Sequence, residues 1–447
     1  MKKRIAAFLA CCLTGISIMA QSDTNEWTLK DCIDYAIEHN IDIKQRLLQK
    51  DNAEIILNTS QMSRLPDLSA SVGQEWRFGF ASVLNGVSVG NQAQSNTGFS
   101  VNSSIPLFTG FRINNTIARD RLELAAAVKN MEKAKEDLAL NIVSLYLQAL
   151  FNKELLRVNS EQAALTALQV TRTESLVEAG KIPASQLYDI KAQVAKDELN
   201  VVQAENNVLL SLLDLAQLLD LNDMERFDIL SPDANQLDNT SSASFLLPGD
   251  LYANAVTVRP HILEQELKLK SSEKSLKVAQ SGHWPTLSLG IGYNTSFYYD
   301  YNSSTNSSFA KQFKDNSREY VGLNLSIPIF NRFEVRNQVN SARIAIANQQ
   351  LSLENSKKSL YKEIQTAYYN AVGAQEKYKA ANRAVEASQE SFRYAQERYE
   401  SGKSTVFEFS EVKTKLVQSL SEQIQAKYDF IFRSKILDFY NGKEIMN

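Results

Sequence analysis

Four segments of the chain alternate apolar and polar residues with a period of two, as strands with one apolar face do. They span 67–80, 96–108, 286–299 and 318–330. Each has about 11–14 residues, which is long for a strand of a soluble protein and suits a tilted membrane strand. Their polar face carries Ser, Asn and Gly rather than Lys and Glu. The pattern predicts four membrane strands in two hairpins, with a water-filled lumen on the polar side.

Long helices are predicted after each hairpin. Segment 111–179 contains neither Gly nor Pro and is rich in Ala, Leu, Glu, Lys and Gln, and 333–400 repeats this with only Gly373 as an interruption. At 1.5 Å per residue, roughly 65 residues form a rod of about 100 Å. A second helix of roughly 35 residues is expected to return in each half, at 184–220 and 404–440.

Shorter helices are predicted before the hairpins. One spans 28–64 and begins at a Thr28 capping box, and the other spans about 249–282. Polar loops of low complexity, 81–95 and 300–317, connect the two strands of each hairpin. Aromatic residues crowd the strand ends beside these loops, as in the aromatic girdle of an outer-membrane barrel.

The same order of elements occurs twice in the chain. Residues 100–205 match the segment 222 positions later without a gap, so that Pro106 meets Pro328 and Gly180 meets Gly402. A repeat of this length is one large module in tandem rather than a solenoid unit. The predicted organisation is a first repeat over 21–221 with hairpin 67–108, a polar linker over 222–248, and a second repeat over 249–447 with hairpin 286–330.

The first twenty residues are predicted to be a secretory signal peptide. Basic residues open the segment 1–20, an apolar stretch follows, and Ala20 stands at the expected cleavage site. The mature chain is therefore expected to leave the cytoplasm. Cys32 remains as its one cysteine, so an internal disulfide is excluded, and its place on an amphipathic helix predicts a small buried side chain.

Charge and motifs exclude several classes of function. Three of the 48 Lys and Arg lie in 1–20, which leaves 45 against 51 Asp and Glu, a net charge of −6. A clustered basic face for nucleic acid is therefore not expected. No spacing of metal ligands, phosphate loop or cofactor fingerprint is present, and the chain is predicted not to be an enzyme, with no cofactor and no metal.

Four strands cannot close a barrel in a membrane. An open sheet edge in lipid would leave backbone groups without hydrogen-bond partners, so several chains must contribute strands to one barrel. The helical hairpins of each chain would then continue the barrel as a tube. From this argument alone the number of chains stays open among two, three and four.

The chain resembles the TolC-like outer membrane efflux proteins. The resemblance rests on the signal peptide, the duplicated helix–hairpin–helix halves, Ser104–Phe108 and Ser326–Phe330 at the passages from strand to helix, and Arg398–Gly402 at a helix turn. It implies a mainly α protein, a homotrimer with a twelve-stranded β-barrel in outer membrane lipid and an α-helical tunnel across the periplasm of a Gram-negative bacterium. Partners implied are a periplasmic adaptor and an inner-membrane pump. The linker and the C-terminal tail would form the equatorial region.

The resemblance also assigns candidate residues. The two helix turns would seal the tunnel and meet the adaptor, and Pro106, Phe108, Pro328 and Phe330 would lie at the passages from strand to helix. Where some members carry rings of Asp before the second turn, this chain has candidate entrance charges that are not all acidic. These are Glu390, Arg393, Glu397 and Glu400. The residues of the two turns are Leu176, Val177, Gly180, Lys181, Arg398, Tyr399, Gly402 and Lys403.

Three interpretations of the function stay open at this level. The first is a passive duct that exports small molecules, such as drugs and toxic compounds, as part of a tripartite efflux system. The second is the duct of a type I protein-secretion or metal-cation efflux system, which shares the architecture. The third, from another class, is a periplasmic coiled-coil scaffold without a channel.

Overall fold

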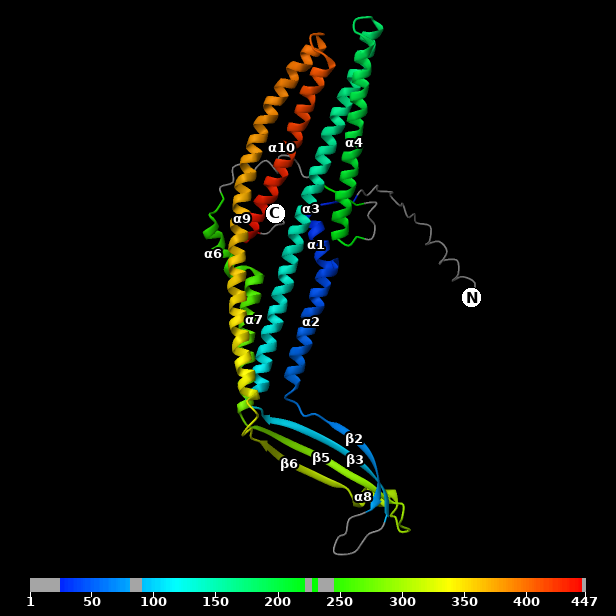
Figure 1. The fold of residues 1–447 in the computed structure, drawn as a ribbon, viewed down its shortest axis with the longest axis vertical. Helices are drawn as coiled ribbons and strands as arrows, with labels where there is room; N and C mark the ends of the chain where they lie inside the picture. The colour runs from blue at the N-terminus through cyan, green and yellow to red at the C-terminus, as the bar shows by residue number, and fades with distance from the viewer. Residues whose placement is uncertain (1–24, 81–90, 222–226, 232–244, 444–447) are drawn as a thin grey trace, which may run out of the picture.

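The computed structural model describes residues 25–80, 91–221, 227–231 and 245–443. These form a long helical body with a four-stranded sheet at one end (Figure 1). The predicted signal peptide 1–20 lies outside the described residues. None of the helices in the described ranges combines the length and the apolar character needed to cross a lipid bilayer.

Four long helices form two hairpins. Helix α3 spans Arg112–Glu178 and α9 spans Glu334–Glu400, 67 residues each. Helices α4, Ala184–Leu218, and α10, Val406–Tyr440, return over 35 residues each. The predicted helices are confirmed, and α9 runs through Gly373 without a break. In the half of the body away from the sheet, α3 packs on α4, α9 packs on α10, and α10 packs on α3.

The two short helices that precede the hairpins are each broken, so the prediction of single helices over 28–64 and 249–282 is wrong. The first is divided into α1, Leu29–His39, and α2, Ile41–Met62, and the second into α6, Pro248–Val258, and α7, Pro260–Gln280. Asn40 ends α1 and caps α2, and Arg259 takes an extended conformation because the next residue is a proline, which disfavours the helical region before it. The Thr28 capping box is confirmed.

The sheet contains β2, Ser69–Phe80; β3, Asn91–Phe108; β5, Thr286–Asp300; and β6, Arg318–Ser326. All neighbours are antiparallel, in the order β2-β3-β5-β6, so the two hairpins join through β3 and β5. Each strand is followed or preceded by a helix, and α2, α3, α7 and α9 pack side by side in the same order as the strands. One order therefore governs both the sheet and the adjoining half of the helical body (Figure 1).

Two details of the second hairpin differ from the prediction. Strand β6 ends at Ser326 rather than at 330, because Ser326 already pairs with Thr286, the first residue of β5. The loop 300–317 contains a short helix, α8, Phe309–Asp315. Its Phe309 and Phe313 rings pack edge-on against Phe99 of β3, at 6.1 and 5.5 Å between ring centroids, an apolar contact that fixes the helix on the sheet.

A compact core lies midway along the body, where two short strands and α1 pack against α3. Strand β1, Asn25–Trp27, pairs in parallel with β4, Phe227–Ile229, which lies in the segment predicted as a linker. Tyr146 of α3 donates a hydrogen bond to the Leu230 carbonyl at 2.7 Å and holds this pair against the helix. Cys32 is fully buried in the same core, as predicted. The remaining linker residues, 222–226 and 232–244, lie outside the described residues.

The break at Asn40 also anchors the end of α4. The Asn40 side chain accepts a hydrogen bond from the Asp42 amide at 2.9 Å and donates one to the Leu218 carbonyl at 3.0 Å. Asp220, in the left-handed conformation with φ 57°, accepts from the Ile41 amide at 2.9 Å. Backbone groups that helix ends leave without partners are thus paired across two elements.

We expect Asn40→Ala to lower the free energy of unfolding by about 1–3 kcal/mol, because it removes a helix cap and leaves a carbonyl at the end of α4 without its donor. Thermal melting of the purified protein followed by circular dichroism measures this. The control, Asn58→Ala, changes an exposed asparagine of α2 and should stay within about 0.5 kcal/mol. Equal melting temperatures for the two variants would contradict the anchoring role.

Candidate docking site at the helix tips

The two helix–helix turns lie together at the end of the body farthest from the sheet (Figure 1). Each turn contains a glycine in the left-handed conformation, Gly180 with φ 66° and Gly402 with φ 73°. In the first turn the Lys181 amide donates to the Leu176 carbonyl, and the Lys403 amide does the same to Arg398 in the second, both at 2.9 Å. Only glycine takes this conformation without steric cost, which explains the residue at both turns.

The predicted turn residues differ in exposure. Lys181, Arg398 and Lys403 are exposed, whereas Leu176 and Val177 are half-buried. Phe407, just after the second turn, is 77 % exposed. The tips therefore present glycines, cations and an exposed aromatic ring to the surroundings, beside the exposed carboxylates of Glu178 and Glu400.

Side chains connect the two tips to one another. Tyr399 stacks on Phe409 at 4.9 Å between ring centroids, and its hydroxyl lies 3.2 Å from the Thr173 hydroxyl on the other hairpin. Arg172 donates to the Glu400 carbonyl at 3.2 Å and forms an ion pair with the Glu400 carboxylate at 3.5 Å. Sequence reasoning did not find Arg172 or Thr173, since no spacing along the chain links residues more than two hundred positions apart.

The predicted entrance charges are paired on the exposed face of α9. Arg393 forms ion pairs with Glu390 at 3.0 Å and with Glu397 at 2.9 Å, one helical turn to either side. The hydrogen bonds that Arg393 donates to the Glu390 carboxylate raise the pKa of the Arg393 guanidinium. The fourth residue, Glu400, is the carboxylate that binds Arg172. The structure does not bring these charges together as an acidic cluster.

The four passage residues lie at the opposite end of the helices. Pro106 and Phe108 are in β3, where the pairing with β5 shifts register, while Pro328 and Phe330 follow the end of β6. Phe108 packs edge-on against Phe111 at 5.5 Å, and Phe330 packs in the same way against the equivalent Phe333 at 5.7 Å. Both repeats thus turn from strand to helix with the same ring contact.

A buried ion pair joins the two hairpins about three helical turns from the tip. Lys413 of α10 is 3 % exposed and binds Asp197 of α4 at 2.5 Å. The ammonium also donates to the Thr166 hydroxyl and, at 3.1 Å, to the Gln162 carbonyl of α3. Gln193 donates to the other oxygen of Asp197 at 2.8 Å. The sequence carried one signal for this residue, because Lys413 lies four residues after Phe409 on the apolar face of α10.

Comparison with known proteins shows the family. The model of the outer membrane efflux protein family matches residues 32–220 and again 251–439, most of the chain. The chain belongs to the outer membrane efflux protein family. The two matches begin 219 positions apart, the same offset by which the helix breaks at Asn40 and Arg259 are separated.

Relatives of this efflux family member include an outer membrane protein and a cation efflux protein. Outer membrane protein TolC of Escherichia coli K12 is 22% identical over 96% of this chain and 84% of its own length. Cation efflux system protein CusC of Escherichia coli O157:H7 is 24% identical over 79% of this chain and 74% of its own. A crystal structure of CusC superposes with a TM-score of 0.77, 16% identity and 93% coverage of this chain and 92% of that one. The predicted fold class and outer membrane location are confirmed.

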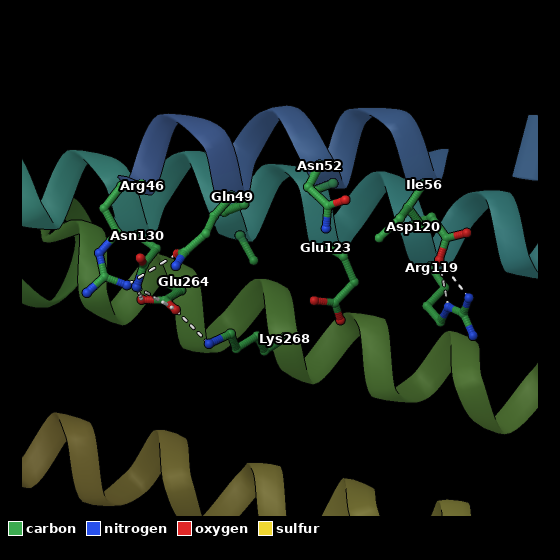
Figure 2. Close-up of a pocket in the computed structure, with 13 residues that line it drawn as sticks. Arg46, Gln49, Asn52, Ile56, Arg119, Asp120, Glu123, Asn130, Glu264 and Lys268 are labelled. Atoms are coloured by element: carbon green, nitrogen blue, oxygen red, sulfur yellow. Dashed lines mark hydrogen bonds and ion pairs between the residues drawn. The ribbon is translucent and has the colours of Figure 1, made fainter. Parts of the chain in front are cut away.

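A hollow lies between α2, α3 and α7 of this efflux protein. It has a volume of about 620 Å³ and is lined by charged and amide side chains (Figure 2). Glu264 binds Lys268 at 2.6 Å, and Asp120 binds Arg119 at 2.7 Å. Two of the three carboxylates of the wall therefore already have cations within it, and the third, Glu123, accepts a hydrogen bond from the Ser271 hydroxyl. Within the described ranges, no cluster of His, Cys, Asp and Glu could hold a metal ion.

We expect Lys413→Met to lower the free energy of unfolding by about 3–5 kcal/mol, because Asp197 would remain buried without a counter-ion. Lys413→Met combined with Asp197→Leu should recover most of this loss, since the double variant leaves no buried charge. Thermal melting of the two variants beside the parent protein measures the difference. A double variant that is no more stable than the single one would show that burial of the charge is not the cause.

Proposed function

We propose that three copies of this chain form a passive duct that carries small molecules, including drugs and toxic compounds, across the outer membrane. An inner-membrane pump supplies the cargo, and a periplasmic adaptor protein connects the pump to the helix tips. The observation that carries the proposal is the open four-stranded sheet joined to helical hairpins of about 100 Å in a member of this family.

The sheet supports assembly into a ring. Among the described strands, β2 pairs only with β3 and β6 pairs only with β5, so each has one edge without backbone partners. Pairing of β6 of one copy with β2 of the next would satisfy both edges, and a head-to-tail contact of this kind generates a closed ring. Three copies give the twelve strands that the family resemblance implies. Exposed apolar side chains on the edge strands suit contact with lipid: Val72, Phe78, Val321, Leu323 and Leu325.

The helices support the same assembly. Apolar residues that a single chain leaves open to water are frequent on the outer helices α4 and α9, and exposed apolar groups that gather on one helix favour a protein contact. A neighbouring copy at these two faces would cover them. The residues concerned are Leu199, Val202, Leu209, Leu210 and Leu213 of α4, and Ile344 and Leu351 of α9.

The names of the relatives indicate two different classes of cargo. One relative is a cation efflux protein, and another is toxin and drug export protein A of Aggregatibacter actinomycetemcomitans. A metal-cation duct is therefore the second candidate. Export assays in cells that carry the chain with its pump distinguish the two, since a drug duct lowers accumulation of dyes and antibiotics, whereas a cation duct raises tolerance to copper or silver salts.

We expect Gly402→Trp to abolish export because it places a bulky ring at the proposed adaptor contact. Gly442→Trp is a matched control. Gly442 ends α10 in the same left-handed conformation, with φ 83° and the same pair of backbone hydrogen bonds, but far from the tip. Both variants bear the same backbone strain, so export by the first and not the second would contradict docking at the tips. Intact trimers of both in the outer membrane must accompany the result.

Assembly itself is tested on detergent-extracted outer membranes. We expect a mass of three chains and threefold particles with a short barrel and a helical rod of about 100 Å. A protein released without detergent as a monomer or dimer would contradict the duct and favour a scaffold.

A further inference from the structure

The acceptors that bind Lys413 on the first hairpin have uncharged counterparts in the second. Thr166 and Asp197 correspond, 222 positions later, to Ser388 of α9 and Ser419 of α10. The two serine hydroxyls hydrogen-bond to one another at 3.0 Å, as Thr166 does to Asp197 at 2.6 Å. The geometry within each hairpin is thus kept, but the carboxylate is replaced by an uncharged group.

The lysine of the site is present in both repeats. Lys413 corresponds to Lys191 of α4. Lys413 crosses to the other hairpin of its own chain, whereas the side chain of Lys191 is 48 % exposed and binds Glu174 of its own hairpin at 2.8 Å. Within the described residues of a single chain, Lys191 therefore has no acceptors on the other hairpin that correspond to Thr166 and Asp197, the acceptors of Lys413.

In a ring of such chains, neighbouring hairpins meet at two kinds of contact, which we call seams. One seam lies within a chain and the other lies between two copies. Within a chain, α10 of the second hairpin packs on α3 and α4 of the first. The repeat relation converts this contact into one between α4 of the next copy and α9 and α10 of this chain. Exposed apolar residues of α4, among them Leu199 and Val202, lie on the same helix as Lys191, which would meet α9 and α10 there.

We propose that α4 of a second copy docks on the face around Ser388 and Ser419, with Lys191 of that copy brought to these serines, and that this seam separates first when the tube widens. The proposal rests on the ring assembly of the proposed function.

The difference between the seams follows from hydrogen bonding. Lys413 has three oxygen acceptors on the other hairpin, from Asp197, Thr166 and Gln162. A displacement too small to admit water would break these charge-assisted bonds with nothing to replace them, which is costly for a buried ammonium. At the seam between copies, Ser388 and Ser419 offer Lys191 no carboxylate, and the ion pair that Lys191 forms with Glu174 lies within its own hairpin, so the same displacement breaks no ion pair.

Cross-linking tests the docking. We expect Lys191→Cys with Ser419→Cys, treated with a short bis-maleimide, to give covalent dimers and trimers on a denaturing gel. The matched pair, Lys413→Cys with Asp197→Cys, should link within one chain and give no ladder. Cys32 does not interfere, because it is fully buried and burial raises the pKa of its thiol to about 12. Threefold particles without a ladder from the first pair overturn the inference and leave the duct standing. Absence of trimers refutes the proposed function itself.

Introducing one carboxylate at the seam between copies tests whether that seam is the weaker one. We expect Ser419→Asp to supply the missing carboxylate, to raise the temperature at which trimers dissociate and to reduce export. Lys191→Met in the same background should remove both effects. Persistence of either effect in the double variant would show that Lys415, one turn away on the same helix, pairs with the new carboxylate, and would overturn the inference.

Discussion

Backbone hydrogen bonding in the sheet is the constraint on which the rest of the architecture depends. The strands have the order β2-β3-β5-β6, and because each adjoins a helix, the helices α2, α3, α7 and α9 must pack in the same order. The two outer strands keep an unpaired edge that hydrocarbon does not tolerate. The need for partners at these edges therefore also decides which helices of the chain face a neighbour and which face one another.

The duplication explains why the two repeats have the same shape, and local sequence changes explain where the repeats differ. Phe111 and Phe333 begin α3 and α9 in the same left-handed conformation, and the two repeats keep equal helix lengths. By contrast, the helix break is made by an asparagine cap at Asn40 and by the proline that follows Arg259. A backbone geometry can thus be retained while the interaction that enforces it changes. Substitution of Asp197 by its serine counterpart is the same kind of change, with a larger electrostatic effect.

Most of the fold could be predicted from the sequence, because its signals are local and long. Glycines mark the ends of the hairpins, and a strict period of two marks the strands. The proline at 260 was a visible sign of the second helix break, whereas Asn40 lies in a segment whose apolar spacing continues on both sides. Helix α8 and the tip contacts of Arg172 and Thr173 could not be predicted, since they depend on residues brought near by the fold. The pairing of Lys413 with Asp197 spans 216 positions and has the same origin.

Equal helix lengths in the two repeats have an evolutionary consequence. Both hairpins consist of a 67-residue helix and a 35-residue helix, and side-chain contacts hold their glycine turns at a fixed offset along the body. An insertion or deletion in one hairpin alone would change this offset and break the contacts between Tyr399 and Thr173 and between Arg172 and Glu400. A change in the length of the helical tube therefore requires insertions or deletions of whole helical turns. These must occur in both helices of a hairpin and in both repeats of the gene.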